Sequence, residues 1–308
     1  MKIYTLAPSE NWICDRFARE WKAHSVSIDA ADPRDADIIW LLADWCWNHI
    51  HPNLLMSKKV VASVHHITPE KFDEKEQQHF KLRDQIVDFY HVPCKKTHDQ
   101  IRNLTKKPIK VFPFWVNPQM WRNQRSQKIS LRKMYDFPED AFLIGSFQRD
   151  TEGHDLISPK LEKGPDLFCD AVEQFAESLE NVQVVLAGWR RQYVMKRLEA
   201  AGIQYYYLEL PAFEVINDLY SALDLYVVSA RYEGGPQAIV ECASNGTPII
   251  STDVGLAAEI LPAESLFIPG KALDAVPNPQ AANKNVQPFL MNQGFKQFED
   301  MFEEVYNQ

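Results

Sequence analysis

The stretch that decides the fold is residues 230–248, ARYEGGPQAIVECASNGTP. Just before it, residues 225–229 are short, apolar and β-branched, which predicts a buried strand of a parallel sheet. The two glycines leave the backbone free to turn, and Pro236 suits a first helical position because its missing N–H costs nothing there. Residues 237–245 then have the apolar spacing of a helix that packs on a sheet, and Gly246 ends it. Strand, turn and helix in this order indicate a doubly wound α/β domain.

The turn in this stretch has the features of an anion site. The first amides of a helix lack partners within the helix, and the helix dipole favours negative charge beside them. Gln237 and Glu241 are four residues apart and share one helix face, so both can point into the same crevice. Glu233 lies eight positions before Glu241. Two carboxylates flanking a phosphate-binding turn predict a ligand that carries both charge and hydroxyl groups.

The pattern around the two glutamates resembles the C-terminal signature of the retaining glycosyltransferases of family 4, the glycosyl transferases group 1. In that family, a glutamate, seven residues and a second glutamate precede a Gly-x-Pro-Val/Ile motif. Here Glu233 and Glu241 precede Gly246 and Pro248, and the frame continues through DVGLAAEI at 253–260. The resemblance implies the GT-B fold: α/β, with two Rossmann-like doubly wound domains facing each other across a cleft. It also implies that Glu233 contacts the donor sugar, as nucleophile or as electrostatic stabiliser, and that Glu241 holds the ribose.

A second element, at residues 145–168, resembles the family's Gly-Arg and Lys-Gly pair, whose cations neutralise the leaving diphosphate. Lys163 matches the lysine. The family's arginine is missing from its usual place, and Arg149 is the nearest cation along the chain. Arg190 and Arg191, which follow a predicted strand, either replace it or cover a helix end. A cation pair beside a departing diphosphate would stabilise its growing negative charge.

The first half of the chain carries a weaker resemblance. His65 follows a predicted strand, as does a family histidine that reaches the donor sugar or the acceptor across the cleft; His66 is the alternative, and a structural role remains open. Where many members have a Gly-rich loop after the first strand, this chain has APSENW at 7–12, so acceptor contacts cannot be transferred. The resemblance thus gives catalytic roles to Glu233 and His65. It gives donor binding to Arg149, Lys163, Gly234, Gly235, Pro236, Gln237 and Glu241.

Strands and helices alternate twice along the chain, as in two doubly wound domains. The predicted strands are 3–6, 38–42, 60–64, 89–92 and 110–114, and then 142–147, 182–187, 205–210, 225–229, 248–252 and 265–268. We expect an N-terminal acceptor-binding domain at 1–125 and a C-terminal nucleotide-sugar donor-binding domain at 126–293. A helix at about 294–308 is expected to pack back on the first domain. Residues 277–288, rich in Pro, Asn and Gln, predict a loop.

Charge is divided unevenly. Residues 1–135 carry 22 Lys and Arg against 15 Asp and Glu, the rest carry 11 against 27, and the net charge is −9. The acidic total argues against a nucleic-acid partner. The basic first half either contacts anionic partners, such as membrane headgroups, or is simply solvated. No stretch is apolar enough to span a membrane, so any membrane contact is expected to be peripheral.

The sequence predicts no metal site and no cofactor. Five scattered cysteines lack metal-ligand spacing and indicate reduced core residues of a cytoplasmic protein. Asp35 and Asp37 form a D-x-D pattern, with which other glycosyltransferases hold a divalent metal. They precede the strand predicted at 38–42, whereas open α/β sheets bind ligands beyond the carboxyl ends of their strands. We therefore expect a surface turn there.

Together these features predict a glycosyltransferase (EC 2.4 class) of glycan biosynthesis. It would transfer a sugar, with retention and without a metal, from a nucleoside diphosphate sugar as co-substrate to a glycan, lipid-linked or small-molecule acceptor. Two alternatives remain. A nucleotide-sugar epimerase on the same fold needs acid and base residues for which no matching set is evident, and a non-catalytic sugar-nucleotide binding subunit would bind the donor without turnover.

Overall fold

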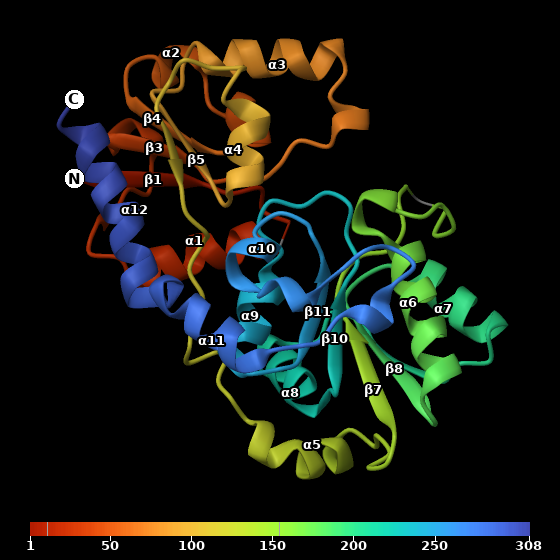
Figure 1. Cartoon of the computed structure of the whole chain (residues 1–308). Helices are drawn as coiled ribbons and strands as arrows, with labels where there is room; N and C mark the ends of the chain where they lie inside the picture. The colour runs from red at the N-terminus through yellow and green to blue at the C-terminus, as the bar shows by residue number, and fades with distance from the viewer. Residues whose placement is uncertain (11, 154) are drawn as a thin grey trace. The chain divides into compact units, whose positions relative to one another are not determined.

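A computed structural model describes residues 1–10, 12–153 and 155–308, which form two compact units. Unit 1 contains Met1–Trp115 and Met291–Gln308, and unit 2 contains Val116–Leu290. Each unit has one six-stranded parallel sheet with helices on its faces (Figure 1). The sequence placed the boundary after residue 125. The structure divides earlier, after Trp115, since Trp121 packs against Phe213 and Tyr220 of unit 2.

The sheet of unit 1 has the strand order β2-β1-β3-β4-β5-β6. In β3, Ile38 and Trp40 face one side while Ile39 and Leu41 face the other, and all four are buried. A central strand covered on both faces has this continuous apolar run. The strands are β1 (Lys2–Leu6), β2 (Ile28–Asp29), β3 (Ile38–Leu41), β4 (Lys59–Ser63), β5 (Phe89–Val92) and β6 (Ile109–Val111). The α-helices are α1 (Ile13–His24), α2 (Pro52–Leu55), α3 (Glu74–Asp84), α4 (Lys95–Ile101) and α12 (Met291–Tyr306).

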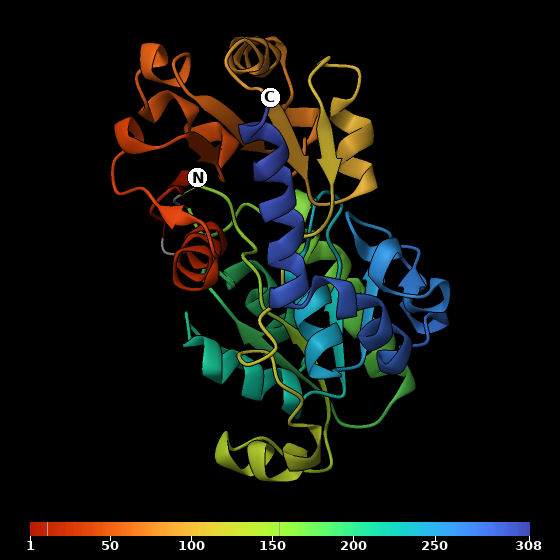
Figure 2. The same ribbon diagram turned by 90° about the vertical axis from the view of Figure 1, so that its left-hand side faces the viewer.

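An aromatic core joins α1 and α12 to one face of this sheet. Phe295, Phe298 and Phe302 recur at the spacing of one helix face, so α12 presents them all on one side. The ring centroid of Phe298 lies 5.2 Å from that of Trp40, and the centroid of Phe302 lies 5.5 Å from that of Trp21. Figure 2 shows α12 running along the sheet of unit 1. The terminal helix therefore completes the core of unit 1, although it follows unit 2 in the chain.

The sheet of unit 2 has the strand order β12-β11-β10-β7-β8-β9. The chain order runs outward from the middle in both directions, so it reverses between β7 and β10, as in a Rossmann-like doubly wound sheet. The strands are β7 (Phe142–Ser146), β8 (Val182–Ala187), β9 (Tyr205–Leu208), β10 (Leu225–Val228), β11 (Ile249–Thr252) and β12 (Leu266–Phe267). The α-helices are α5 (Lys128–Met134), α6 (Pro165–Ser178), α7 (Gln192–Ala200), α8 (Phe213–Ala222), α9 (Gln237–Asn245), α10 (Ala257–Ile260) and α11 (Pro279–Val286).

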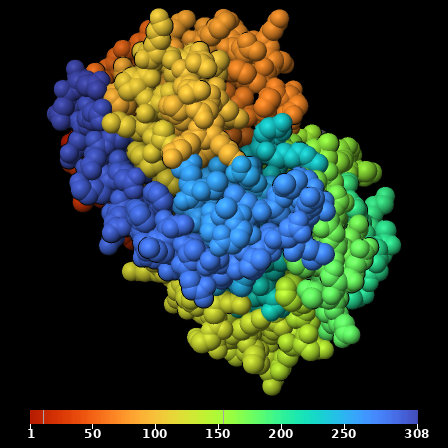
Figure 3. Space-filling view, in the orientation of Figure 1, coloured from red at the N-terminus to blue at the C-terminus, as the bar shows by residue number. Residues whose placement is uncertain are grey.

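Residues 277–288 contain a helix, so the loop predicted there is wrong. Asn278 caps α11, because its side-chain oxygen accepts from the Ala281 amide at 3.0 Å, and Pro279 occupies the first turn. Ala282 and Val286 are four residues apart and buried, which anchors one face of the helix. The segment from α10 to α11 forms much of the surface of unit 2 that faces the viewer in Figure 3. The Pro and Asn that suggested a loop are thus helix-start residues.

Candidate functional site

The candidate site of unit 2 lies where β7 and β10 leave the sheet. The two strands pair in parallel, with Ile144 opposite Leu225. Because the chain order reverses between them, their carboxyl ends form a topological switch point, the usual ligand position in open α/β sheets. Residues 147–149 follow β7 and residues 229–236 follow β10. The fold therefore brings the loops of two predicted donor elements to one edge of the sheet.

Lys163 and Glu233, both predicted from the sequence, form an ion pair at this edge. Lys163 Nζ bonds Glu233 Oε1, and the two side chains are 22% and 18% exposed. Partial burial weakens solvent screening of the pair. The site therefore holds a cation and a carboxylate in direct contact, each within reach of solvent.

Gly164 allows the turn that carries Lys163 to dock on β10. Its φ is +61°, and a Cβ built there would lie 1.9 Å from the Ser229 carbonyl oxygen. Only glycine fits this close approach. The carbonyl oxygen of Glu162 accepts from the amides of Arg231 and Tyr232 at 2.8 and 3.1 Å. The backbone of one donor element is thus hydrogen-bonded to the other.

Lys160 is a third cation of the site, and the sequence analysis did not identify it. It is the N-cap of the 3₁₀ turn Leu161–Lys163. Its Nζ lies 3.3 Å from Glu162 Oε1. Burial lowers the pKa of Lys160, and the charges of Lys163 and Arg149 lower it further, against the opposing effect of Glu162. Three positive charges, of Lys160, Lys163 and Arg149, therefore lie close together here. In the sequence, only the short spacing between Lys160 and Lys163 indicated that Lys160 belongs to the site.

Arg149 lies at the base of a short hairpin formed by residues 151–159, of which residue 154 is outside the described residues. Thr151 bridges Pro159, and the Glu152 amide donates to the Ser158 carbonyl at 2.9 Å. Arg149 Nε donates to the Thr151 carbonyl at 2.8 Å. The insertion after β7 is thus a hairpin that fixes part of the Arg149 guanidinium and returns the chain to Lys160.

Arg191 is a structural residue rather than a replacement for the family's arginine. It is fully buried, and its Nε lies 2.8 Å from Asp150 Oδ1. Its Nη1 also donates to the carbonyl oxygens of Ser146 and Ala187, at the ends of β7 and β8. The neighbouring Arg190 is buried as well and donates to the Gly153 carbonyl. Both arginines hold strand ends and the hairpin together.

Gly255 and Leu256 contact the turn at 234–236 and hold it in place. Gly255 has a φ of +51°, and a Cβ there would lie 2.1 Å from the Gly234 carbonyl oxygen. The Leu256 amide donates to that same oxygen at 2.9 Å. Pro236, which was predicted to be the first helical residue, is instead the N-cap of α9, and the half-buried Gln237 begins the helix. The amides of this helix start thus lie at the switch point.

Glu241 is buried within α9, with 5% of its surface exposed. The Tyr220 hydroxyl donates to Glu241 Oε2 at 2.9 Å. A carboxylate is rarely buried without hydrogen-bond partners. Glu241 is therefore not a solvated helix position, and its side chain is directed toward Tyr220 of α8.

In unit 1, His65 lies just beyond the carboxyl end of β4. Its Nε2 lies 2.9 Å from the Leu42 carbonyl oxygen and 3.7 Å from Cys14 Sγ, and its ring stacks on Phe114 at 5.3 Å. A carbonyl only accepts, so Nε2 donates in this contact. His65 thus stands at the sheet edge where α/β domains bind ligands.

The aspartates of the D-x-D pattern lie at the opposite, amino end of the unit 1 sheet. Asp37 precedes β3, and its Oδ2 accepts from the Lys2 amide at 2.7 Å. Across residues 1–10, 12–153 and 155–308, no three His, Cys, Asp or Glu side chains cluster as metal ligands. The five cysteines are buried, and none of them forms a disulfide. Within the same ranges, no helix combines the length and apolarity needed to span a membrane.

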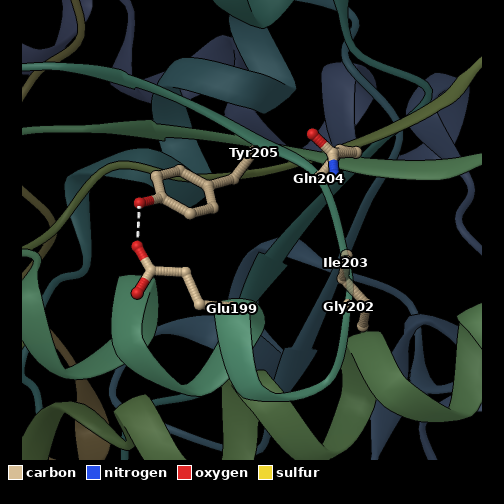
Figure 4. A pocket seen from close by; sticks show the side chains of 5 residues that line it. All are labelled: Glu199, Gly202, Ile203, Gln204 and Tyr205. Atoms are coloured by element: carbon tan, nitrogen blue, oxygen red, sulfur yellow. Dashed lines mark hydrogen bonds between the residues drawn. The ribbon is translucent and has the colours of Figure 1, made fainter.

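A pocket of about 450 Å³ lies away from these residues, at the amino end of β9. Its lining is Glu199, Gly202, Ile203, Gln204 and Tyr205, and Figure 4 shows the Tyr205 hydroxyl bonded to Glu199 Oε1 at 2.6 Å. The carboxyl ends of the strands carry the predicted residues, so size alone does not identify the site.

Comparisons with known protein sequences give matches over part of the chain. Residues 159–308 match a family model described as glycosyl transferases group 1. A lipopolysaccharide core biosynthesis mannosyltransferase of Rhizobium meliloti (strain 1021), LpsB, is 29% identical over 140 residues. That match covers 42% of this chain and 40% of the relative, so the chain corresponds to less than half of its length.

Similar solved structures cover both units. Anabaena HepE, solved with UDP and with UDP-glucose, has a TM-score of 0.77 at 15% identity, covering 99% of this chain and 100% of its own. A sucrose-phosphate synthase of Thermosynechococcus elongatus has a TM-score of 0.69 at 17% identity, covering 88% and 74%. At such identities the likeness shows the fold. The chain thus has the GT-B fold predicted from its sequence, and its C-terminal half matches the glycosyl transferases group 1.

Proposed function

We propose that this protein is a glycosyltransferase that moves a sugar from a nucleoside diphosphate sugar to an acceptor, with retention at the anomeric carbon and without a metal. The observation that carries the proposal is the Lys163–Glu233 ion pair at the β7/β10 switch point, with Lys160 and Arg149 nearby. The group 1 family match and the UDP-glucose complex of HepE support a sugar-nucleotide donor.

The cations suit the leaving group. As the bond between sugar and diphosphate breaks, negative charge grows on the diphosphate, and fixed positive charges stabilise it most in the transition state. Lys163, Lys160 and Arg149 would supply these charges, with the amides at 234–237 as further donors. No divalent cation is required in this scheme, because the protein itself neutralises the diphosphate.

Glu233 suits the sugar. Its carboxylate contacts Lys163, and a diphosphate on Lys163 would bring the anomeric carbon next to it. A negative charge there stabilises the positive charge that develops on the sugar ring. Glu233 acts either as a nucleophile or as an electrostatic stabiliser. Glu241, at the far end of the same motif, would bind the ribose hydroxyls.

Unit 1 would bind the acceptor, a glycan, a lipid-linked sugar or a small molecule. His65 would contact the acceptor or the donor sugar, because imidazole nitrogens form hydrogen bonds with sugar hydroxyls. The exposed residues Lys95, Lys96 and Lys106 lie on and after α4 and would offer cations for peripheral contact with anionic lipid headgroups, whereas Arg102 is paired with Asp99 at 3.4 Å. Buried thiols outside disulfides fit a reducing compartment such as the cytoplasm.

A donor panel tests the proposal. The protein is incubated with UDP, GDP, ADP and dTDP sugars, and release of the nucleoside diphosphate is measured with and without simple sugar acceptors. We expect turnover with one donor class and its loss in Glu233→Gln. Saturable donor binding without any turnover would instead indicate a sugar-nucleotide binding subunit, and no binding of any donor would overturn the proposal.

A further inference from the structure

Tyr220 lies beneath the switch point in an aromatic cluster. It belongs to α8, and 2% of its surface is exposed. Its ring centroid lies 5.0 Å from that of Phe147, 5.3 Å from that of Tyr226 and 5.8 Å from that of Trp121. The rings fix the phenol in place and leave its hydroxyl 2.9 Å from Glu241 Oε2.

The hydroxyl can only donate in this contact. Burial, and then the charge of Glu241, raises the pKa of Tyr220 well above its ordinary value, so the phenol keeps its proton. A hydrogen bond to a carboxylate is charge-assisted, and exclusion of water strengthens it further. The contact therefore restrains one carboxylate oxygen of Glu241.

The two helices that carry these side chains are also locked together. Thr247 Oγ1 donates to the Tyr220 carbonyl at 2.8 Å. Asn245 Nδ2, at the end of α9, lies 2.8 Å from Asn217 Oδ1 of α8. With both backbones fixed, the hydroxyl and the carboxylate cannot separate without breaking buried hydrogen bonds, each of which is costly to leave unmade.

We propose that Tyr220 is a positioning residue for nucleotide recognition: its hydrogen bond to Oε2 holds the Glu241 carboxylate in the orientation in which it binds the ribose hydroxyls. This inference rests on the proposed function, in which Glu241 binds the ribose. It goes further by naming the residue that orients the Glu241 carboxylate. It also predicts that discrimination between ribose and deoxyribose depends on a hydroxyl that never touches the nucleotide.

Tyr220→Phe removes the hydroxyl and keeps the ring. Binding is measured by calorimetry for UDP and GDP and for their 2′-deoxy and 3′-deoxy forms. The wild-type protein should prefer one ribonucleotide over its deoxy forms. In the variant, affinity for that ribonucleotide should fall by roughly tenfold, as expected for loss of order in a charge-assisted contact. Affinity for the deoxy form that lacks the recognised hydroxyl should stay nearly the same.

Tyr226→Phe is the matched control. Tyr226 belongs to the same buried cluster, but its hydroxyl accepts from the Phe147 amide at 2.9 Å rather than contacting Glu241. A general loss of packing would weaken ribo- and deoxyribonucleotides equally in both variants. Glu241→Gln should abolish the discrimination, and adding Tyr220→Phe to it should change little more. If Tyr220→Phe is not folded by circular dichroism, Tyr220→Met gives the same prediction.

Two failures are distinguishable. If the wild type discriminates and Glu241→Gln does not, while Tyr220→Phe keeps the full wild-type ratio, the positioning role is wrong and the proposed function stands. If none of UDP, GDP, ADP and dTDP binds the wild-type protein, the nucleotide site itself is wrong and the inference falls with it.

Discussion

At the residue scale, Lys163 is the side chain whose removal distinguishes catalysis from binding. We expect Lys163→Ala to lower kcat by about a hundredfold, the cost of losing one preorganised charge at a transition state. Donor affinity should fall less, because the diphosphate carries less charge before the bond breaks. Steady-state kinetics and donor calorimetry measure the two effects. Lys271→Ala, at an exposed lysine of unit 2, is the control. Equal losses of kcat and donor affinity in Lys163→Ala would contradict the proposal that Lys163 stabilises the departing diphosphate.

Gly255 offers a second residue-scale prediction. In Gly255→Ala, the new Cβ would lie 2.1 Å from the Gly234 carbonyl oxygen and 2.6 Å from that of Glu233, so the turn must move. We expect weaker UDP or GDP binding and a lower Tm. Gly202→Ala is the control, since Gly202 also has a positive φ but nothing lies within 4 Å of its added Cβ. Gly202→Ala should cost only about 1–2 kcal/mol of backbone strain. Equal nucleotide binding by both variants would contradict the proposed role of Gly255 in holding the turn.

The sequence could predict residues whose chemistry lies in a local pattern. Glu233, Lys163 and Glu241 belong to short motifs, and the fold brings the first two into contact. Lys160 was harder to predict, because it reaches the site only through the folding of the hairpin that precedes it in the chain. Tyr220 looks like any aromatic core residue of a helix, and only the packing of α8 against α9 shows its hydroxyl on Glu241.

At the element scale, β5 contains a buried histidine that makes unit 1 sensitive to acid. Burial, with a smaller effect of the His65 charge and against the Phe112 hydrogen bond, lowers the pKa of His91 to about 3. The unfolded chain protonates this side chain near its ordinary pKa of about 6.5. The unfolded state therefore binds more protons below pH 6.5, and stability falls as the pH drops from there toward 3.

His91→Gln should remove this pH dependence. Between pH 7 and pH 5 the wild type should lose about 2 kcal/mol of unfolding free energy that the variant keeps, because His91 contributes up to about 1.4 kcal/mol per pH unit in this range. Urea unfolding at both pH values measures the difference. His79→Gln, at an exposed histidine of α3, should retain the wild-type dependence; identical slopes for wild type and His91→Gln would refute the assignment.

The strands and helices could be predicted where apolar residues recur with a clear strand or helix periodicity. The buried strands of both sheets begin and end within about three residues of the predicted bounds, but β2 was missed because only two residues form it and Ile28 is exposed. The helix α5 lies in a polar, basic segment that resembles a linker. Arg132 of that helix is buried, and it pairs with Asp224 at 2.5 Å. Tertiary contacts thus decide these elements.

At the scale of the whole molecule, we predict that transfer does not depend on a divalent metal. Activity should persist in excess EDTA, because Lys163, Lys160 and Arg149 would neutralise the diphosphate. The double variant Asp35→Asn/Asp37→Asn should also stay active, since both residues lie at the amino end of the sheet. Donor turnover is measured with and without the chelator. Loss on chelation that manganese or magnesium restores, and that salt does not, would overturn the metal-free mechanism.

The position of α12 has a consequence for the order in which the protein can be made. Synthesis on the ribosome delivers residues 1–115 first, then all of unit 2, and only then Met291–Gln308. Until α12 emerges, Trp21, Trp40 and Trp115 lack the phenylalanines that cover them. Unit 2 has its whole chain available earlier, so it can fold first. The nascent unit 1 meanwhile exposes an apolar face, which is the condition under which chains aggregate or recruit chaperones.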